Sequence, residues 1–346
     1  MSLPSRASYR DIPLYSPSKA RCRVDLSDNT NLFGMPPAAE RVLREVAAPL
    51  VTRYPVGYSP DLREAVAHYT GVDTSWVTTG CGSDDVIDST LRAFLEPGDL
   101  IAFPAPTFVM MSYFAKVNGL RYTPVNLRPD FDIDVEGLLA TQAKLIYVCS
   151  PNNPTGTVAS RAALEQLIER APGIVLLDEA YAEFARESHL DLARRPNVLV
   201  SRTMSKAFGL ASMRVGYAVG APSLVAEVEK ARGPYKVTAL SERMAVAALR
   251  EDVPWMKARV AESLAVRERL VAGLQGMGLT CLPTEANFVM VKLQGALEVA
   301  ERMRARDVNV RAFAGLPAGI GDALRIGCGP WDVIQTALDA LREERR

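Results

Sequence analysis

Short apolar segments alternate with amphipathic segments from about residue 50 to about residue 235, and this alternation limits the possible folds more than any other feature. Six apolar segments have the length and the β-branched content of buried strands. These six are Trp76–Thr79, Leu100–Phe103, Leu145–Cys149, Ile174–Leu177, Val198–Val200 and Val215–Val219. Helix patterns lie between them, such as Asp84–Leu95, which ends before Pro97-Gly98, and Arg161–Arg170, which Ser160 can cap. The region predicts an α/β domain with a largely parallel sheet.

The pattern changes after residue 235. A long amphipathic helix is predicted at Pro254–Leu274, and a terminal helix is predicted from about Trp331. A strand, a helix and a second strand are predicted between them, at Asn287–Val291, Leu297–Arg306 and Ala323–Ile326. Prolines between residues 36 and 49 indicate that the N-terminal segment crosses outside the main sheet. We therefore predict a large domain at 45–235 and a smaller α+β domain built from 1–44 and 236–346.

The composition argues against several classes of function. Forty basic residues balance forty acidic ones among 346 residues, so no net field attracts nucleic acid or an anionic membrane. Five widely spaced cysteines predict reduced thiols in a cytoplasmic protein rather than disulfides or a zinc site. The two histidines, His68 and His189, are too few for a His-based metal centre. Residues 1–19 lack the apolar core of a signal peptide, and no segment approaches the ~20 apolar residues of a membrane span.

Lys206 follows the predicted strand Val198–Val200 in a loop rich in small and polar residues. Thr203 and Ser205 precede this lysine by three residues and one residue, and Arg214 follows it by eight. Two hydroxyls and a guanidinium are suitable ligands for a phosphate group. The amine can then form a Schiff base with an aldehyde on the same ligand, and pyridoxal 5'-phosphate carries both groups. For an isolated Ser-Lys pair the alternative is an ordinary surface lysine.

Two turns follow other predicted strands. Thr79–Asp85 lies between a strand and a helix, where small residues let backbone N–H groups meet a phosphate, and a plain tight turn is the alternative. The turn is not a dinucleotide fingerprint, because Asp85 stands where a third glycine is needed. The segment Ser150–Gly156 places Asn153 at a strand end, where ligands bind in open α/β folds. A turn without a ligand is the alternative.

Two further strand ends carry candidate side chains. Asp178 directly follows the strand Ile174–Leu177, where its carboxylate can pair with a protonated pyridine nitrogen and raise the pKa of that nitrogen. Such a ring is an electron sink, and Tyr181 can bond its phenolic oxygen. The alternative for Asp178 is a helix N-cap. Phe108, in a proline-rich turn, can present a flat face to a ring, with core packing as the alternative.

Together these motifs resemble those of the fold-type I pyridoxal-phosphate aminotransferases, and within them the histidinol-phosphate aminotransferase subfamily. The resemblance covers almost the whole chain, from the motifs Pro13-Leu-Tyr15 and Leu26–Gly34 to Leu324-Arg325-Ile326. It implies a mostly parallel seven-stranded sheet in the large domain. It implies that the cofactor is held by Tyr54 of the neighbouring subunit and by Gly82, Ser83, Asp84, Phe108, Asn153, Asp178, Tyr181, Thr203, Ser205, Lys206 and Arg214. The substrate-binding residues that it implies are Tyr15, Asn31, Arg311 and Arg325.

The same resemblance implies an aminotransferase. The amino group would move between an amino acid or amino-alcohol phosphate, histidinol-phosphate-like or aromatic, and a 2-oxo acid such as 2-oxoglutarate. Lys206, Asp178 and Tyr181 are the implied catalytic residues, in a homodimer whose active sites are shared between subunits. One alternative is an amino-acid-phosphate decarboxylase, which has the same motifs. Another is a non-catalytic regulatory domain that binds the cofactor, although the chain has no helix-turn-helix extension.

One segment departs from the subfamily pattern. The subfamily usually has Asn-Glu-Asn-Pro where this chain has Asn29-Thr30-Asn31-Leu32. In the family the missing glutamate lies near the substrate entrance. The departure therefore bears on an imidazole-bearing substrate, and the sequence leaves the amino donor open.

Overall fold

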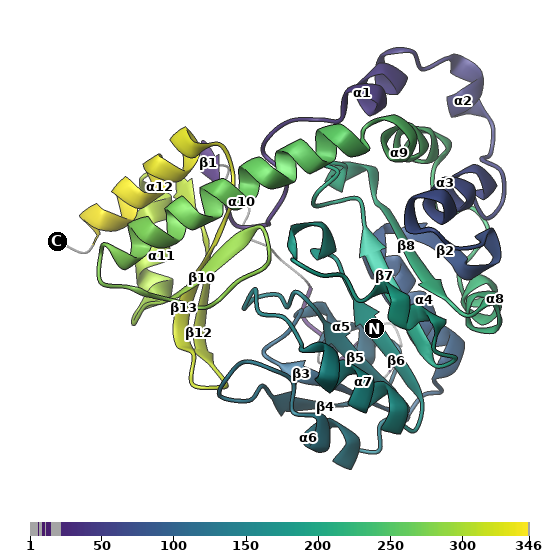
Figure 1. The fold of residues 1–346 in the computed structure, drawn as a ribbon, viewed down its shortest axis with the longest axis horizontal. Coiled ribbons are helices and arrows are strands. Elements are labelled where there is room, and N and C mark those ends of the chain that lie inside the picture. The colour runs from purple at the N-terminus through teal and green to yellow at the C-terminus, as the bar shows by residue number, and fades with distance from the viewer. Residues whose placement is uncertain (1–5, 7–8, 11, 15–21, 345–346) are drawn as a thin grey trace, which may run out of the picture.

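A mixed seven-stranded sheet forms the centre of the larger part of the molecule (Figure 1). The computed structural model describes residues 6, 9–10, 12–14 and 22–344. The strand order is β2-β8-β7-β6-β5-β3-β4, and β8 alone among these seven runs in the opposite direction to the other six. The strands are β2 (Val77–Cys81), β3 (Leu100–Ala105), β4 (Arg121–Asn126), β5 (Leu145–Cys149), β6 (Ile174–Asp178), β7 (Val198–Thr203) and β8 (Val215–Gly220). The predicted fold class, a mostly parallel seven-stranded sheet, is confirmed.

The central strands are continuous apolar runs because both of their faces are covered. Along β5, Ile146 and Val148 belong to one core, whereas Leu145 and Tyr147 belong to the core on the opposite face. This alternation follows from the two-residue period of a strand. The edge strand β4 was not predicted, because it contains Pro124 and its residues are mostly exposed or half-buried. Proline is tolerated at a sheet edge, where no further strand needs its missing N–H.

Helices cover both faces of this sheet (Figure 1). One core includes buried residues of α3 (Pro60–Thr70), α6 (Val135–Ala140), α7 (Arg161–Arg170) and α9 (Ala239–Glu251). The opposite core includes those of α4 (Gly82–Phe94), α5 (Met110–Val117) and α8 (Pro222–Ala231). Helix α7 has its predicted bounds and its predicted cap, since Ser160 Oγ accepts a hydrogen bond from the Ala163 amide at 3.2 Å.

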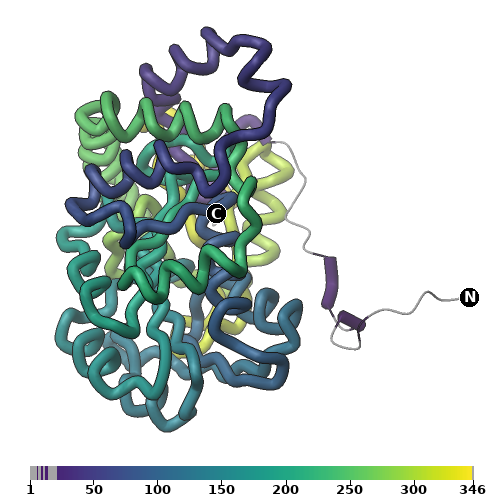
Figure 2. Tube along the Cα trace, turned by 90° about the vertical axis from the view of Figure 1, so that its right-hand side faces the viewer, coloured from purple at the N-terminus to yellow at the C-terminus, as the bar shows by residue number. Residues whose placement is uncertain are grey.

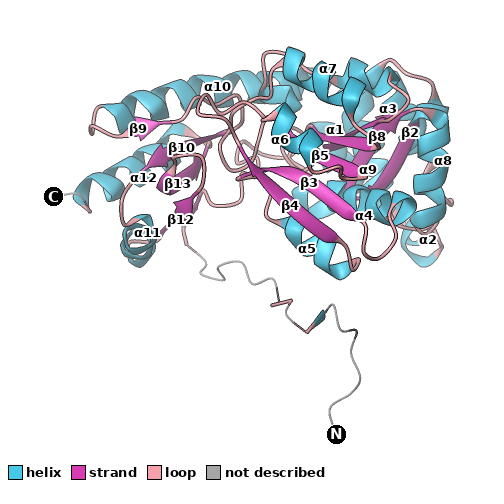
Figure 3. Ribbon diagram, turned by 90° about the horizontal axis from the view of Figure 1, so that it is seen from below, coloured by secondary structure: helices cyan, strands magenta, loops and turns pink. Residues whose placement is uncertain are grey.

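A second, smaller sheet has its own core (Figure 3). Its order is β12-β13-β10-β9, all antiparallel. The strands are β9 (Thr280–Cys281), β10 (Phe288–Lys292), β12 (Arg311–Leu316) and β13 (Gly321–Gly327). The helices beside it are α10 (Val253–Gln275), α11 (Ala296–Ala305) and α12 (Trp331–Glu343). The N-terminal strand β1 (Val24–Asp25) joins this part by pairing with β11 (Val308–Asn309).

Helix α10 connects the two parts, because it contributes to both cores. Met256 and Val260 pack in the core of the large sheet, whereas Leu270 and Leu274 pack in the core of the small one. Helix α9 packs entirely with the large sheet, and α1 (Pro37–Arg44) and α2 (Ala48–Thr52) lie beside it at one end of the molecule (Figure 2). The division of the chain at residues 44/45 and 235/236 therefore stays a prediction, with α9 on the large-sheet side of the packing.

Candidate active site

A cavity of about 680 Å³ lies between the large sheet and the small one. Its floor is formed where β5, β6 and β7 end, at Cys149, Asp178 and Thr203. Carboxyl ends of parallel strands are where open α/β sheets bind ligands. The cavity brings together twelve of the residues selected from the sequence: Ser83, Asp84, Phe108, Asn153, Asp178, Tyr181, Thr203, Ser205, Lys206, Arg214, Arg311 and Arg325.

Lys206 extends into this cavity from the loop after β7. Its Nζ donates a hydrogen bond to the Asp28 carbonyl at 2.8 Å and lies 5.8 Å from the centre of the Tyr181 ring. Burial, together with the guanidinium of Arg325, lowers the pKa of Lys206 to about 8. A substantial fraction of the amine is therefore neutral near physiological pH, which is the state that acts as a nucleophile or a base.

Asp178 ends β6 and is held by neighbours on both flanking strands. Its Oδ2 accepts a hydrogen bond from the Tyr147 hydroxyl at 2.8 Å, and its Oδ1 accepts one from Ser201 Oγ at 3.1 Å. Burial raises the pKa of Asp178 to about 6, and these two hydrogen bonds oppose that rise. The helical turn that follows, Ala182–Phe184, has Tyr181 at its N-cap position. Asp178 is therefore not a helix cap but a fixed carboxylate on the cavity floor.

An anion-binding cradle lies at the start of α4. This helix has 13 residues and begins at Gly82-Ser83-Asp84, and Ser83 and Asp84 line the cavity, so the helix N-terminus lies at the cavity. Gly82 has φ +80°, and a Cβ there would lie 2.5 Å from Arg214 Nη2, so a larger residue would displace the guanidinium. Arg214 Nη2 lies 3.3 Å from Asp84 Oδ2.

Hydroxyl groups complete this cradle on the side of β7. Thr203 Oγ1 donates to Ser205 Oγ at 2.9 Å, and both side chains line the cavity. Helix N–H groups, two hydroxyls and a guanidinium form a donor set that fits a phosphate monoester. The cradle lies on the same cavity wall as Lys206 and Asp178.

Three further predicted residues lie around the lysine. The Tyr181 hydroxyl accepts a hydrogen bond from Asn29 Nδ2 at 3.2 Å, and burial raises the pKa of Tyr181. Asn153 Oδ1 accepts a hydrogen bond from Arg325 Nη1 at 2.5 Å. Phe108 lines the cavity and also packs against the core beneath the sheet, so the two interpretations of its ring are compatible.

The opposite wall of the cavity carries two arginines. Arg311 on β12 and Arg325 on β13 are directly paired in the antiparallel ladder, so their side chains share one face of the small sheet. Arg325 also donates through Nη2 to the Ser27 carbonyl. Two guanidiniums on one wall provide a place for an anionic substrate group.

Comparisons with known proteins agree with this geometry. The family described as Aminotransferase class I and II matches residues 23–341. This chain belongs to the class I and II aminotransferases. A histidinol-phosphate aminotransferase of Thermoanaerobacter pseudethanolicus is 35% identical over 328 residues, which cover 93% of each chain. One of Roseiflexus castenholzii is 37% identical over 334 residues, which cover 92% of this chain and 89% of the relative.

Solved structures give the same family. The histidinol-phosphate aminotransferase of Sinorhizobium meliloti, solved with pyridoxal 5'-phosphate, superposes on this aminotransferase with a TM-score of 0.85 and 25% identity. The match covers 94% of this chain and 91% of the other. The N-succinyldiaminopimelate aminotransferase of Mycobacterium tuberculosis has the same fold, with a TM-score of 0.82, 23% identity and 93% of each chain covered. The predicted recognition of the family is confirmed.

Four predicted site residues are not among the described residues that line the cavity of this aminotransferase. Gly82 lies just behind it, at the start of α4. Tyr15 lies outside the described residues. Asn31 faces away: its Nδ2 donates to the Ala207 carbonyl at 3.0 Å and its Oδ1 accepts from the Phe33 amide at 2.8 Å. Asn29 lines the cavity, and the role of Asn31 in substrate binding stays a prediction.

Tyr54 is the fourth of these residues. Its side chain is 85% exposed and contacts the ring of Tyr235, with ring centres 5.3 Å apart. It lies on the molecular surface of this aminotransferase, in the segment between α2 and α3. Within one chain it contributes nothing to the cavity.

Sequence reasoning missed three residues that hold the predicted ones. Tyr147 and Ser201 bind the carboxylate of Asp178, and Asn29 binds Tyr181. The available signal was a polar side chain within an otherwise apolar strand, two residues before Cys149 in the case of Tyr147. On a strand that spacing places Tyr147 on the same face as Cys149, beside the end of β6.

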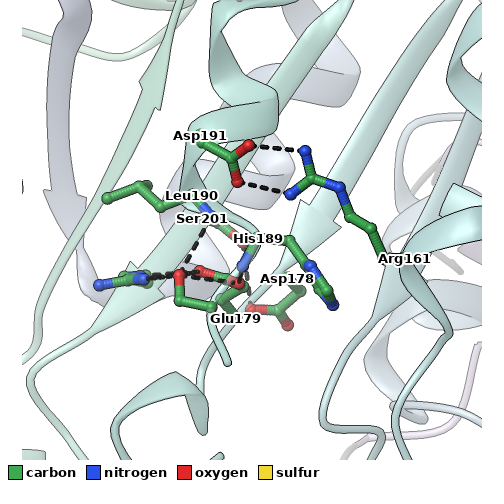
Figure 4. Close-up of polar contacts among 9 residues, drawn as sticks. Arg161, Asp178, Glu179, His189, Leu190, Asp191 and Ser201 are labelled. Carbon is green, nitrogen blue, oxygen red and sulfur yellow. Dashed lines mark hydrogen bonds and ion pairs between the residues drawn. The ribbon is translucent and has the colours of Figure 1, made fainter. Parts of the chain in front are cut away.

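An ion pair next to Asp178 joins the C-terminal ends of β6 and β7 (Figure 4). Glu179 accepts hydrogen bonds from Arg202 Nε and Nη2 at 3.0 and 2.7 Å and from the His189 amide at 2.5 Å. A second pair, Arg161 with Asp191, lies nearer the surface. Because Glu179 follows Asp178 directly, its buried bonds fix the backbone that carries the carboxylate of Asp178.

Among the described residues, no three His, Cys, Asp or Glu side chains gather in a way that would hold a metal ion. None of the helices formed by those residues is long and apolar enough to span a bilayer.

Proposed function

We propose that the cavity of this aminotransferase binds pyridoxal 5'-phosphate and transfers an amino group between an amino donor and a 2-oxo acid. The observation that carries the proposal is the position of Lys206. Its amine, with a pKa lowered to about 8, shares one cavity with the anion cradle at α4 and the buried carboxylate of Asp178. A phosphate, an aldehyde and a ring nitrogen on one small molecule would meet these three groups.

Each part of the cofactor has a residue suited to it. The N-terminus of α4, Ser205 and Arg214 would bind the phosphate, and Asp178 would pair with the ring nitrogen. Tyr181 and Asn153 would contact the phenolic oxygen. When bound, pyridoxal 5'-phosphate supplies a cationic ring that withdraws electrons from the substrate α-carbon. The protein keeps that ring cationic with one carboxylate, whose own charge Tyr147 and Ser201 favour.

Lys206 would move the proton of the reaction. Its Nζ is a base in the neutral form, so it can accept a proton from the substrate α-carbon and return it to a neighbouring carbon. Burial beside Arg325 brings the pKa of Lys206 near the working pH, which suits an amine that both accepts and donates. Tyr181 lies next to the amine and limits its movement.

The substrate proposed is an amino acid or an amino-alcohol phosphate, of the histidinol-phosphate-like or aromatic class, with 2-oxoglutarate as the acceptor. Arg311 and Arg325 would bind its anionic group by charge-assisted hydrogen bonds. The relatives named above support histidinol phosphate. Thr30, which lines the cavity where the subfamily usually has glutamate, instead favours a donor without an imidazole ring.

We also propose a cytoplasmic homodimer in which Tyr54 of one subunit reaches the cofactor phosphate of the other. Tyr54 is exposed beside other exposed apolar side chains, at Val51, Val56 and Tyr235. A second copy of the chain would bury this surface, as an exposed apolar patch on a soluble protein requires. All five cysteines are free thiols, which suits a reducing compartment.

A spectrophotometric screen of single half-reactions tests the proposal. The enzyme with its cofactor is mixed with histidinol phosphate, an aromatic amino acid or glutamate, and conversion of the cofactor to its amine form is followed. We expect conversion by at least one donor and by glutamate, with release of the 2-oxo product. Release of carbon dioxide in place of a 2-oxo product would establish the decarboxylase, and no conversion by any donor would reject the aminotransferase assignment.

A further inference from the structure

The segment that carries Tyr54 ends in a strained backbone. Tyr58 and Ser59, next to each other at the start of α3, have φ values of +62° and +47°. These are left-handed conformations that residues other than glycine adopt at a cost in free energy. They persist only where the surrounding structure holds them. The segment 53–58 forms no strand, so its hold must come from elsewhere.

That hold is provided by the turn 232–235, which follows α8. The Tyr58 amide donates a hydrogen bond to the Pro234 carbonyl at 2.8 Å. The rings of Tyr54 and Tyr235 lie 5.3 Å apart at 32°. The guanidinium carbon of Arg232 lies 5.5 Å from the centre of the Tyr58 ring. Each contact joins the Tyr54 segment to the same turn.

Arg232 is the buried member of this turn, with 1% of its surface exposed. Its Nη2 donates to Thr79 Oγ1 at 3.1 Å and its Nη1 lies 3.3 Å from Glu229 Oε2. Its Nε has no hydrogen-bond partner among the described residues. A desolvated cation is attracted to an aromatic face more strongly than an exposed one. The contact with Tyr58 is therefore a principal interaction of this side chain.

Arg232 contacts both Thr79, which is close to the anion cradle, and Tyr58, which is close to Tyr54. The two residues differ in the other contacts that hold their backbones. Thr79 is on β2, three residues before the start of α4, and it is paired with Tyr217 in the ladder between β2 and β8. The backbone of Thr79 would keep its place without the arginine. Tyr58 does not belong to a β-strand, so the loss of Arg232 should displace mainly the segment that carries Tyr54.

We propose that Arg232 is a positioning residue for Tyr54, and that it therefore serves the active site of the partner subunit rather than the site in its own chain. This inference rests on the proposed homodimer. One buried guanidinium then sets the position of a hydroxyl that the other site uses to hold the cofactor phosphate.

The binding constant of the apo-enzyme for pyridoxal 5'-phosphate gives the first test. Arg232→Met keeps the aliphatic stem and removes the charge, and it should raise the Kd about 10-fold, as Tyr54→Phe should, because each removes one hydrogen bond to a charged group. If Arg232 acts through Tyr54, the double variant should bind no more weakly than the weaker single variant. Additive losses would overturn the inference. Arg63→Met is the matched control, since Arg63 donates to the Thr74 carbonyl on the nearby surface.

Mixed dimers decide which site Arg232 serves. A chain with Lys206→Ala is exchanged with a chain with Arg232→Met, and cofactor trapped by borohydride reduction is measured together with activity. If Arg232 acts on the partner, one site per mixed dimer keeps both its lysine and a correctly placed Tyr54. That site should then bind the cofactor with wild-type affinity. If Arg232 acts on its own site through Thr79, neither site is intact and no tight site should form.

The parallel mixture of Lys206→Ala with Tyr54→Phe separates the two proposals. Recovery there, without recovery in the Arg232 mixture, would overturn only the inference about Arg232. No recovery in either mixture, with subunit exchange verified, would reject the shared site itself.

A second variant covers the case in which Arg232→Met does not fold. Tyr58 is 39% exposed, so Tyr58→Leu removes the ring under the guanidinium with less disturbance of the core. Tyr58→Phe keeps the ring and is its control. Tyr58→Leu should weaken cofactor binding at the partner's site in the same mixture, whereas wild-type binding by Tyr58→Leu would overturn the inference.

Discussion

The two walls of the cavity are built in different ways. On the wall formed by the large sheet, each reactive group is fixed by its neighbours: Tyr147 and Ser201 hold Asp178, Asn29 holds Tyr181, and Lys206 is bonded to the Asp28 carbonyl. The wall formed by the small sheet presents Arg311 and Arg325. Its strand β12 changes register between Phe313 and Leu316, next to these arginines.

This difference separates chemistry from substrate choice. Catalytic groups need fixed positions, and a parallel sheet buried on both faces provides them. Residues that bind the non-reacting part of a substrate can differ between enzymes, provided that their charge is opposite to that of the substrate. The fold is shared with the N-succinyldiaminopimelate aminotransferase named above.

The largest effect is expected at the lysine. Lys206→Ala removes the amine that holds the cofactor and moves the proton, so activity should fall by about 10⁴-fold or more. Borohydride reduction followed by mass spectrometry should find no covalent cofactor in the variant. The control is Lys144→Ala, at a surface lysine paired with Asp99. A covalent cofactor in the Lys206 variant would place the chemistry elsewhere.

The next largest effect is expected at the carboxylate on the same wall. Asp178→Asn keeps the shape and one acceptor oxygen but cannot keep a ring nitrogen protonated. We expect turnover to fall about 10²- to 10³-fold, with a much smaller change in cofactor affinity. Steady-state kinetics and a cofactor titration measure the two quantities. Near wild-type turnover would show that the carboxylate has no role in the reaction.

The sequence predicted the large-sheet wall better than the small one, for physical reasons. Buried strands such as Leu145–Cys149 are readable as apolar runs, and the groups that follow them must meet at one sheet edge. The sequence pattern does not show in which direction the side chains of an irregular segment point. Asn29 has φ +58°, which turns the chain so that Asn29, not Asn31, faces the cavity. The pairing of Arg311 with Arg325 depends on the register of β12 and β13, which the sequence did not supply.

A smaller effect is expected on the substrate wall. Arg325→Met should lower kcat/KM about 10- to 100-fold for an anionic substrate by removing a charge-assisted contact. Most of that change should be in KM, with a smaller change in kcat because Arg325 also lowers the pKa of Lys206. Arg311→Met compares the second arginine of the same ladder pair. A loss of kcat equal to the loss of kcat/KM would mean that this wall also takes part in the chemistry.

The smallest effect is expected on the free energy of unfolding, which the buried carboxylate of Asp178 lowers when it is ionised. Burial raises the pKa of Asp178 from 3.8 to about 6, so the folded apo-enzyme binds this proton more tightly than the unfolded chain does. The stabilising contribution of the group is complete below pH about 4 and is lost as the pH rises through about 6. Relative to Asp178→Asn, the wild-type free energy of unfolding should therefore fall by about 2 kcal/mol between pH about 4 and pH about 7.

Denaturant unfolding of the two apo-proteins across that range measures this difference. Asp191 provides a contrast of opposite sign, because the hydrogen bond from Arg161 holds its pKa below the usual value. The contribution of Asp191 is present at neutral pH and is lost as the pH falls, so Asp191→Asn should lose stability at neutral pH and not in acid. If Asp178→Asn followed the pattern of Asp191→Asn, the carboxylate on the cavity floor would be a stabilising group, and the fixed wall would cost the fold nothing.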